Sequence, residues 1–359
     1  MNVEDELKKD GIKVIKPLDA LSITLIAKFI SEKFISNLPF YRFNYHELFS
    51  KIKKINMYIA DIPEGKSEAN YFYKNSSIYF KQGLSMDQIK ELAVHEFIHY
   101  FQEVKDNKGI LYRLGLCDFS KVKVHNMALN EAAVQLITSK VLNKDIDSVK
   151  YYDIQFSTNS PSYYPMICNL VNQMAYIVGE NILFDSTLYS NDRFKNSFIK
   201  LCGQKTYNRI SKNLDKILCA EEKIIIYTSK LENNELNEKD ISKISCKIIN
   251  NKKIIKDIFI QTQNFIFTSY FNNKLNALYS SQDIEDYRKK LYNYKDLLGI
   301  TDNYTYFNDY YINRMTQLDS IYESFDNKLP VVYKKSFLQI LFSKIVKLFN
   351  NKLVVDERN

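Results

Sequence analysis

One short segment, His95-Glu96-Phe97-Ile98-His99, constrains this chain more than any other feature, because it places two of the four histidines four residues apart. On an α-helix, side chains four positions apart lie on the same face, roughly 5–6 Å from each other. Both imidazole rings can therefore turn a nitrogen toward one metal ion, an arrangement typical of zinc. Glu96 lies on a neighbouring edge, where its carboxylate can reach a metal-bound water without binding the metal. The spacing predicts a zinc ion held by His95 and His99, with Glu96 as general base.

The residues before this motif predict that it lies inside a helix. Ser85 and Gln88 form an S-x-x-Q capping pattern, which starts a helix at about residue 86. Apolar residues follow at mostly helical spacing from residue 89 to residue 98. The alternative is a chance match on a charged helix, and with four histidines in 359 residues only a few chains in a thousand, on the order of magnitude, would show one. The metal site is therefore the favoured interpretation.

A hydrolytic zinc site needs a third protein ligand and one open position for water. Glu103 continues the four-residue series after His99. It lies eight residues beyond His95, which is about 12 Å along a helix axis, so these two side chains cannot share an ion. We therefore expect Glu103 to be a solvated helix residue.

Two acidic residues further along the chain are the other candidates for the third ligand. Asp118 lies in a segment with glycine and serine that predicts a loop, and no helix of its own orients it. Glu131 lies in residues 124–138, a strongly helical run that can lie across the first helix. We predict Glu131 as the third ligand, and Asp118 remains the alternative.

The HExxH segment and the Asn-Glu-Ala sequence at residues 130–132 together resemble the gluzincin family of zinc metallopeptidases. Members of this family pair HExxH with a downstream glutamate on a second helix. The resemblance covers roughly residues 50–205, and these two motifs are its specific part. The gap between the motifs is longer than in thermolysin-like members and is closer to that of some clostridial zinc toxins.

The resemblance implies that His95, His99 and Glu131 bind one zinc ion per chain and that Glu96 activates water to hydrolyse a peptide bond. It also implies a peptide or a protein as substrate. Gln135, four residues after Glu131, stands where many members have an acid. Its side chain can still accept a hydrogen bond from a ligand histidine, which such histidines usually require. An amide is a weaker base than a carboxylate, so the electronic properties of the bound metal would differ from those in members with an acid.

Two segments before the HExxH helix are rich in strand-forming residues. Residues 55–60 predict a strand, and residues 71–80 predict a hairpin with its turn near Asn75. In zincin folds, an edge strand just before this helix pairs with an extended substrate, and residues 78–81 are placed for that role. The alternative is that these strands only close the sheet.

The pattern as a whole predicts an α+β fold that is mainly helical. An N-terminal helical segment, residues 1–50, is expected to pack on the core. Residues 51–205 are expected to form a zincin-like catalytic core with a small mixed sheet and the HExxH helix. Residues 206–359 predict a helical C-terminal domain or extension. Only eight glycines and six prolines are present, which argues against a β-rich architecture with long loops.

A few further side chains are candidates for roles at the site. A donor for the developing oxyanion is expected from a later segment, and Tyr163 and Tyr164, just before a predicted helix, are the first candidates. His125 is interpreted as a capping or surface residue, with a hydrogen bond to substrate or to a ligand as the alternative. His46 has no second ligand near it in the sequence and is expected to be structural.

Charge and hydropathy limit the kinds of partner that this chain is expected to bind. The net charge of +8 is spread along the chain without a basic stripe, so nucleic acid is not expected as a partner. No run predicts a transmembrane segment. Residues 336–349 predict a helix that docks on the protein's own core or, alternatively, contacts a membrane surface or a partner. Five cysteines without paired spacing and an N-terminus without a signal-peptide core indicate a cytoplasmic rather than a secreted protein.

Two functions remain open at this stage. The first is a zinc-dependent metallopeptidase, a hydrolase that acts on peptide bonds. The second is a non-catalytic helical interaction module that retains a zincin fold. Glu96 favours the first, because a site that only binds a partner has no need of a general base beside its ligands.

Overall fold

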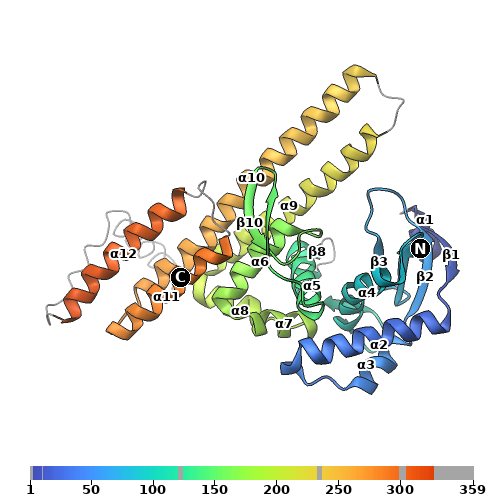
Figure 1. Ribbon diagram of the computed structural model, residues 1–359, viewed down its shortest axis with the longest axis horizontal. Helices are drawn as coiled ribbons and strands as arrows, with labels where there is room; N and C mark the ends of the chain where they lie inside the picture. Colours follow the sequence, from blue (N-terminus) through green and yellow to red (C-terminus); the bar gives the residue numbers. More distant parts are fainter. Residues whose placement is uncertain (1–2, 10, 120–123, 233–236, 299–304, 327–359) are drawn as a thin grey trace, which may run out of the picture. The chain divides into compact units, whose positions relative to one another are not determined.

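The computed structural model describes residues 3–9, 11–119, 124–232, 237–298 and 305–326 (Figure 1). The contacts divide the chain into two compact units. The first comprises Met1–Ala277 and Lys289–Phe307, and the second comprises Leu278–Arg288 and Asn308–Asn359. The domain boundary expected at residue 205 falls inside the first unit, which also contains every candidate site residue.

The described chain is mainly helical with one small mixed sheet, as the sequence predicts. The sheet has four strands in the order β1-β2-β4-β3. The strand β2, Asn56–Asp61, runs parallel to β4, Ser77–Lys81. The strand β3, Ala69–Phe72, is antiparallel to β4, so the expected strand and the expected hairpin are both present.

The N-terminal segment is less uniformly helical than expected. It contains the helices α1, Val3–Lys9, α2, Ala20–Asn37, and α3, Tyr45–Ile52, with a short 3-10 helix, Pro39–Tyr41. Between α1 and α2, however, β1, Lys13–Pro17, pairs with β2 and forms one edge of the sheet. A strand whose residues are all exposed carries no alternating apolar pattern, which explains why the sequence did not reveal it.

The hairpin places its two strands in an order that the sequence did not predict. β4 lies between β2 and β3, so residues 78–81 are in the interior of the sheet. The edge role expected for residues 78–81 therefore falls to β3. Burial explains the order, because β4 is buried along four of its five residues, whereas β3 is mostly half-buried.

The helix α4, Met86–Phe101, starts where the capping pattern predicts. The Ser85 hydroxyl accepts a hydrogen bond from the Gln88 amide, and the Gln88 side chain accepts one from the Ser85 amide. Ala93, Val94 and Phe97 are fully buried and hold one face of α4 against the protein interior.

Short strands join α4 to the next long helix. β5, Glu103–Lys105, pairs with β6, Leu111–Leu114, and β7, Asp118–Phe119, pairs with β8, Val124–His125.

In these strands, two acidic residues lie in other elements than the sequence predicts. Glu103 is neither helical nor solvated, because α4 ends at Phe101 and the Glu103 side chain is 7% exposed beside Lys105 and Tyr71. Asp118, which was expected in a loop, lies in a strand and is paired with His125.

The helix α5, Met127–Val141, begins three residues later than the run at residues 124–138 predicts, because Val124 and His125 belong to β8. Almost all of α5 is buried. Small residues such as Ala128, Ala132 and Ala133 let neighbouring elements approach it closely, and it contacts α4 directly.

The remaining elements of the first unit form a largely helical body. The hairpin of β9, Asp147–Tyr151, and β10, Ile154–Thr158, precedes α6, Pro165–Val178, α7, Glu180–Leu188, and α8, Arg193–Cys202. Two long helices, α9, Gln204–Leu231, and α10, Glu238–Leu275, then run side by side in opposite directions (Figure 1). The predicted succession of helices after residue 205 is therefore present among the described residues.

The last two described helices cross the boundary between the units. α11, Ser281–Leu298, begins in the second unit, and α12, Thr305–Asp326, ends in it. Within the second unit, the Arg288 guanidinium pairs with Glu285 and with Asp319. None of the described helices combines the length and the apolar character that a membrane crossing requires. The helix predicted at residues 336–349 lies outside the described residues.

One acidic residue of α9, Glu221, is buried. Glu221 is 7% exposed, and its Oε1 has no hydrogen-bond partner among the described residues. Burial, with a smaller contribution from the charge of Glu222, raises the pKa of Glu221 to about 8. The folded protein therefore keeps this carboxyl neutral at a pH where the unfolded chain ionises it.

Replacing Glu221 with glutamine is expected to stabilise the protein at pH 8 but not near pH 4.5. The stability from the neutral carboxyl is complete below its ordinary pKa of 4.5 and is lost as the pH rises toward about 8. Glutamine cannot ionise, so Glu221→Gln avoids this loss, which is roughly 4 kcal/mol at pH 8. Urea unfolding at both pH values measures the difference. Glu232→Gln, at the exposed C-terminal end of the same helix, is the control, and a gain from Glu221→Gln that does not change with pH would contradict the prediction.

Candidate metal centre

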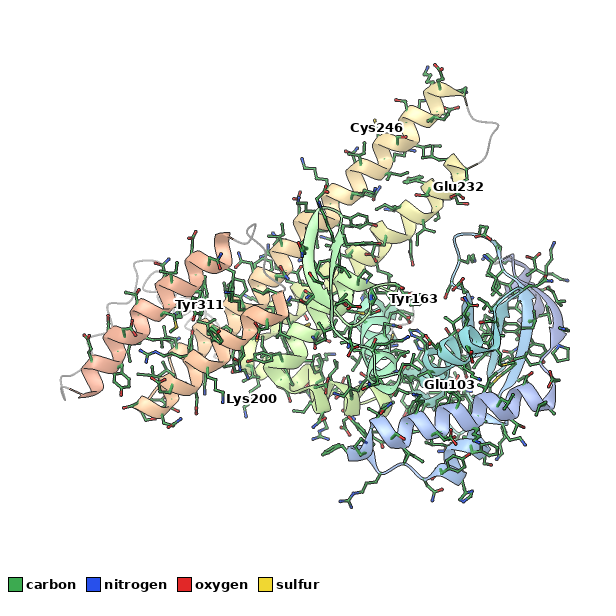
Figure 2. The ribbon with its side chains drawn as sticks, viewed as in Figure 1. Glu103, Tyr163, Lys200, Glu232, Cys246 and Tyr311 are labelled. Atoms are coloured by element: carbon green, nitrogen blue, oxygen red, sulfur yellow. The ribbon has the colours of Figure 1, made fainter. Side chains whose placement is uncertain are left out.

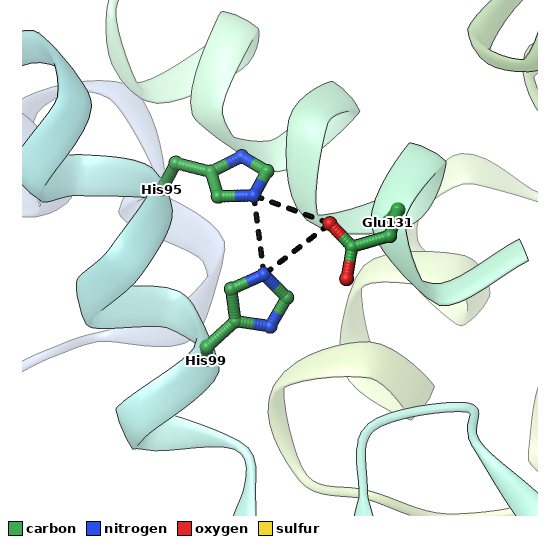
Figure 3. Close-up of side chains that lie close together, drawn as sticks. All are labelled: His95, His99 and Glu131. Atoms are coloured by element: carbon green, nitrogen blue, oxygen red, sulfur yellow. Dashed lines mark hydrogen bonds and ion pairs between the residues drawn. The ribbon is translucent and has the colours of Figure 1, made fainter. Parts of the chain in front are cut away.

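The three predicted ligands lie together at the contact between α4 and α5 (Figure 3). His95 and His99 extend from one face of α4, with their Nε2 atoms 3.1 Å apart. Oε2 of Glu131, from α5, is 3.5 Å from the Nε2 of His95 and 3.6 Å from the Nε2 of His99. Asp118 and Glu103, the other acidic candidates, are not part of this group.

The distances between these atoms fit a tetrahedral ion. Two ligands about 2.0–2.1 Å from zinc, at the tetrahedral angle, lie roughly 3.3 Å from each other. The three separations between the Nε2 and Oε2 atoms, 3.1, 3.5 and 3.6 Å, lie close to that value. Two imidazoles and one carboxylate also form a donor set that zinc uses in hydrolytic sites, where the fourth position stays open.

The charge of Glu131 favours a cation beside the two histidines. Burial lowers the pKa of His99, but the charge of Glu131 and its hydrogen bond raise it more, to about 9. Burial raises the pKa of Glu131, and the charge of His99 and the hydrogen bond from His95 more than reverse this, so the pKa lies well below its usual range. Glu131 is therefore an anion at neutral pH. A metal ion that binds there replaces the proton of His99 as its partner.

The second nitrogen of His95 is oriented by a residue that the sequence singled out. Nδ1 of His95 donates to Oε1 of Gln135, one turn after Glu131 on α5, at 3.0 Å. This bond orients the ring with Nε2 toward Glu131, so Gln135 makes the hydrogen bond to His95 that the sequence predicts. Nδ1 of His99, in contrast, is buried without a hydrogen-bond partner among the described residues.

A buried polar network holds the two ligand-bearing helices in register. Oδ1 of Asn130, next to Glu131, accepts hydrogen bonds from the Leu116 amide at 2.9 Å and from Nε2 of Gln102 at 3.2 Å. The amide of Gly115 donates to the hydroxyl of Ser190 at 2.7 Å. Because Gln102 follows α4 and Asn130 lies in α5, these bonds set the distance between the histidines and Glu131.

Gly115→Ala is expected to destabilise the protein by about 2–4 kcal/mol and to weaken metal binding. Gly115 has φ +55°, and a Cβ atom there would overlap the side chains of Asn130 and Gln102. Gly109→Ala is the matched control, because Gly109 also has a positive φ, +76°, but its Cβ would meet nothing within 4 Å. That control should lose only about 1 kcal/mol, the backbone contribution. Equal losses in urea unfolding would show that the network does not matter.

Glu96 lies near the three predicted ligands and is not part of their group. It is 6% exposed, and its Oε2 accepts a hydrogen bond from the Tyr71 amide of β3 at 2.6 Å. This amide therefore points away from β4 and toward α4. One carboxylate oxygen is held by the edge strand, and Glu96 also lines a cavity between α4, α5 and the loop before α6.

The two candidate oxyanion donors lie on the loop before α6, where Tyr163 is labelled in Figure 2. The hydroxyl of Tyr163 donates to Oε2 of Glu68 at 3.2 Å. The Tyr164 carbonyl accepts a hydrogen bond from the Cys168 amide, but its hydroxyl makes none to another described residue. Burial raises the pKa of both hydroxyls, and for Tyr164 the charges of Glu131 and Glu96 raise it further. Both tyrosines therefore keep their protons, and Tyr164 is the better candidate because the Tyr163 hydroxyl already donates to Glu68.

Sequence reasoning missed two contributors to the site. The first is the Tyr71 amide, because a main-chain donor leaves no mark in the residue pattern. The second is Gln102, three residues after His99, whose helical spacing could have indicated that it lies near the ligands. The other two histidines, His46 and His125, are exposed and take no part in the group.

A scan against protein-family models and searches of curated proteins and of solved structures found no match to this chain. The assignment of a function therefore rests on the residues and on their geometry.

Proposed function

We propose that this protein is a zinc-dependent metallopeptidase of the gluzincin type, with His95, His99 and Glu131 as zinc ligands. The observation that supports this most is the approach of Oε2 of Glu131 to both imidazole Nε2 atoms at tetrahedral separations. A buried ion pair alone would explain the contact of Glu131 with one histidine. It would not require both rings to point at the same oxygen with a second carboxylate, that of Glu96, beside them.

The reaction is hydrolysis of a peptide bond. Zinc supplies Lewis acidity toward a water molecule and toward the scissile carbonyl when it is bound. Glu96 takes a proton from the attacking water and transfers it to the nitrogen of the leaving amine. The Tyr71 amide holds Glu96 in place for both transfers. Tyr164 donates a hydrogen bond to the oxygen that becomes negatively charged.

The sheet offers a place for the main chain of the substrate. β3 is an edge strand and contacts α4, the helix that carries the histidines and Glu96. An extended peptide can add to such an edge by main-chain hydrogen bonds to groups other than the Tyr71 amide, which donates to Glu96. This arrangement would bring the scissile bond close to Glu96.

The test combines metal content with cleavage. The purified protein, incubated with zinc and then dialysed, should contain one zinc ion per chain and should cleave members of a mixed peptide library. Removal of zinc by a chelator should stop cleavage, and added zinc should restore it. A protein that binds no zinc under these conditions would refute the proposal and would leave the helical interaction module as the better account.

A further inference from the structure

A cavity of about 250 Å³ lies beside the candidate metal centre. Its lining includes residues of α4 between 88 and 96, and residues between 135 and 144 at the end of α5 and just after it. Residues 159–164 and the pair Ser67 and Glu68, just before β3, complete its wall. Since His95 and Glu96 line the same cavity, a group bound there would lie next to the reacting bond.

Most residues that line this cavity carry a polar group, and Leu92, Leu142 and Pro161 are the exceptions. The polar side chains also contribute carbon atoms, so the larger part of the exposed wall is apolar. A wall of this kind suits a side chain with an apolar stem and a charged or polar head, as lysine and arginine have.

The charges of the wall favour a cation. Three carboxylates, those of Glu68, Glu91 and Glu96, line the cavity with a single ammonium group, that of Lys144. Glu91 is already paired with Lys144 at 3.0 Å. Glu68 accepts a hydrogen bond from the neutral hydroxyl of Tyr163, and no cationic side chain of the described residues pairs with it. The charge of Glu68 is therefore uncompensated at the cavity.

We propose that this cavity binds a lysine or arginine side chain of the substrate and that Glu68 is the carboxylate that recognises its charge. Tyr163 acts as a positioning residue, because its hydroxyl holds Glu68 across the cavity from the loop before α6. The inference rests on the proposed function and names the substrate class: peptides with a basic residue beside the scissile bond.

Binding of hydroxamate peptides to the zinc-loaded protein tests the inference without relying on turnover. Three probes differ only in the residue next to the hydroxamate, which is lysine, norleucine or glutamate. Calorimetry should show that the lysine probe binds about tenfold more tightly than the norleucine probe, because a charge-assisted hydrogen bond is strong. The glutamate probe should bind most weakly.

Two variants connect the preference to the named residues. Glu68→Gln should bring the affinity for the lysine probe down to that for the norleucine probe. Tyr163→Phe, which leaves the carboxylate in place, should reduce the preference only in part. Glu64→Gln is the matched control, because Glu64 lies in the same loop, is exposed, pairs with Lys81 at 2.6 Å and does not line the cavity. This control should leave all three affinities unchanged.

The outcomes separate this inference from the proposed function. If zinc is bound and the norleucine probe binds as tightly as the lysine probe, the basic preference is refuted while the metal site stands. A lysine preference that survives Glu68→Gln would refute the role of Glu68. Failure of all three probes to bind a zinc-loaded protein would refute the cavity as a substrate site. Failure to load zinc at all would instead refute the proposed function.

Discussion

Glu131→Ala is expected to reduce the zinc content from one ion per chain to nearly none after dialysis. The substitution removes the only carboxylate of the three-residue group and leaves two histidines. Loss of a residue that merely orients a ligand typically costs 10- to 100-fold in metal affinity, so loss of a ligand should cost more than about 100-fold. Metal analysis of the dialysed protein, with competition against a chelating dye, measures both quantities.

Glu103→Gln is the matched control for this experiment. Glu103 is the acidic residue that a helical series after His99 would select, but the structure places it in β5 beside Tyr71 and Lys105. Glutamine can still accept the hydrogen bond from the Tyr71 hydroxyl, so this variant should fold and keep its zinc. If Glu131→Ala retained zinc while Glu103→Gln lost it, the ligand set would be wrong.

Glu96→Gln is expected to lower kcat/KM for peptide cleavage by about 10²–10⁴-fold, the usual contribution of a general base, without loss of zinc. Glutamine keeps the size of the side chain and can still accept the hydrogen bond from the Tyr71 amide. It cannot take a proton from water. The combination of full zinc content and lost turnover is what distinguishes a general base from a metal ligand or from a residue that the fold needs.

The control for Glu96→Gln comes from the first turn of the same helix. Asp87 is exposed, pairs with Lys90 at 3.0 Å and does not line the cavity. Asp87→Asn should therefore leave both zinc content and turnover unchanged. Cleavage by Glu96→Gln at the wild-type rate, measured with the same peptide, would exclude Glu96 as the base and would require another proton acceptor.

Several parts of the fold could be predicted because they depend on neighbours in the sequence. The start of α4 follows from a capping box between Ser85 and Gln88, whose hydrogen bonds span one helical turn. The hairpin of β3 and β4 follows from two strand-forming runs around a short turn. Such features need no knowledge of the rest of the chain, because the interacting groups lie within a few residues of each other.

Other parts could not be predicted, because they depend on which segments meet. The exposed strand β1 has no apolar pattern, and only its pairing with β2 defines it. The order that puts β3 at the edge of the sheet is set by burial of β4 against the interior. Glu103 leaves the helix for β5 because it pairs with a partner strand, which local helix propensity does not reveal.

The candidate site divides in the same way. The four-residue spacing of His95 and His99 determined by itself that both rings share one face of a helix, because helical geometry is local. The sequence also proposed Glu131. Only the tertiary structure decided that α5 brings this carboxylate to 3.5 and 3.6 Å from the two rings, that the Tyr71 amide holds Glu96, and that Glu68 lines the same cavity as His95 and Glu96. The physical reason is that these contacts join segments far apart in the chain, whose approach depends on the packing of the whole unit.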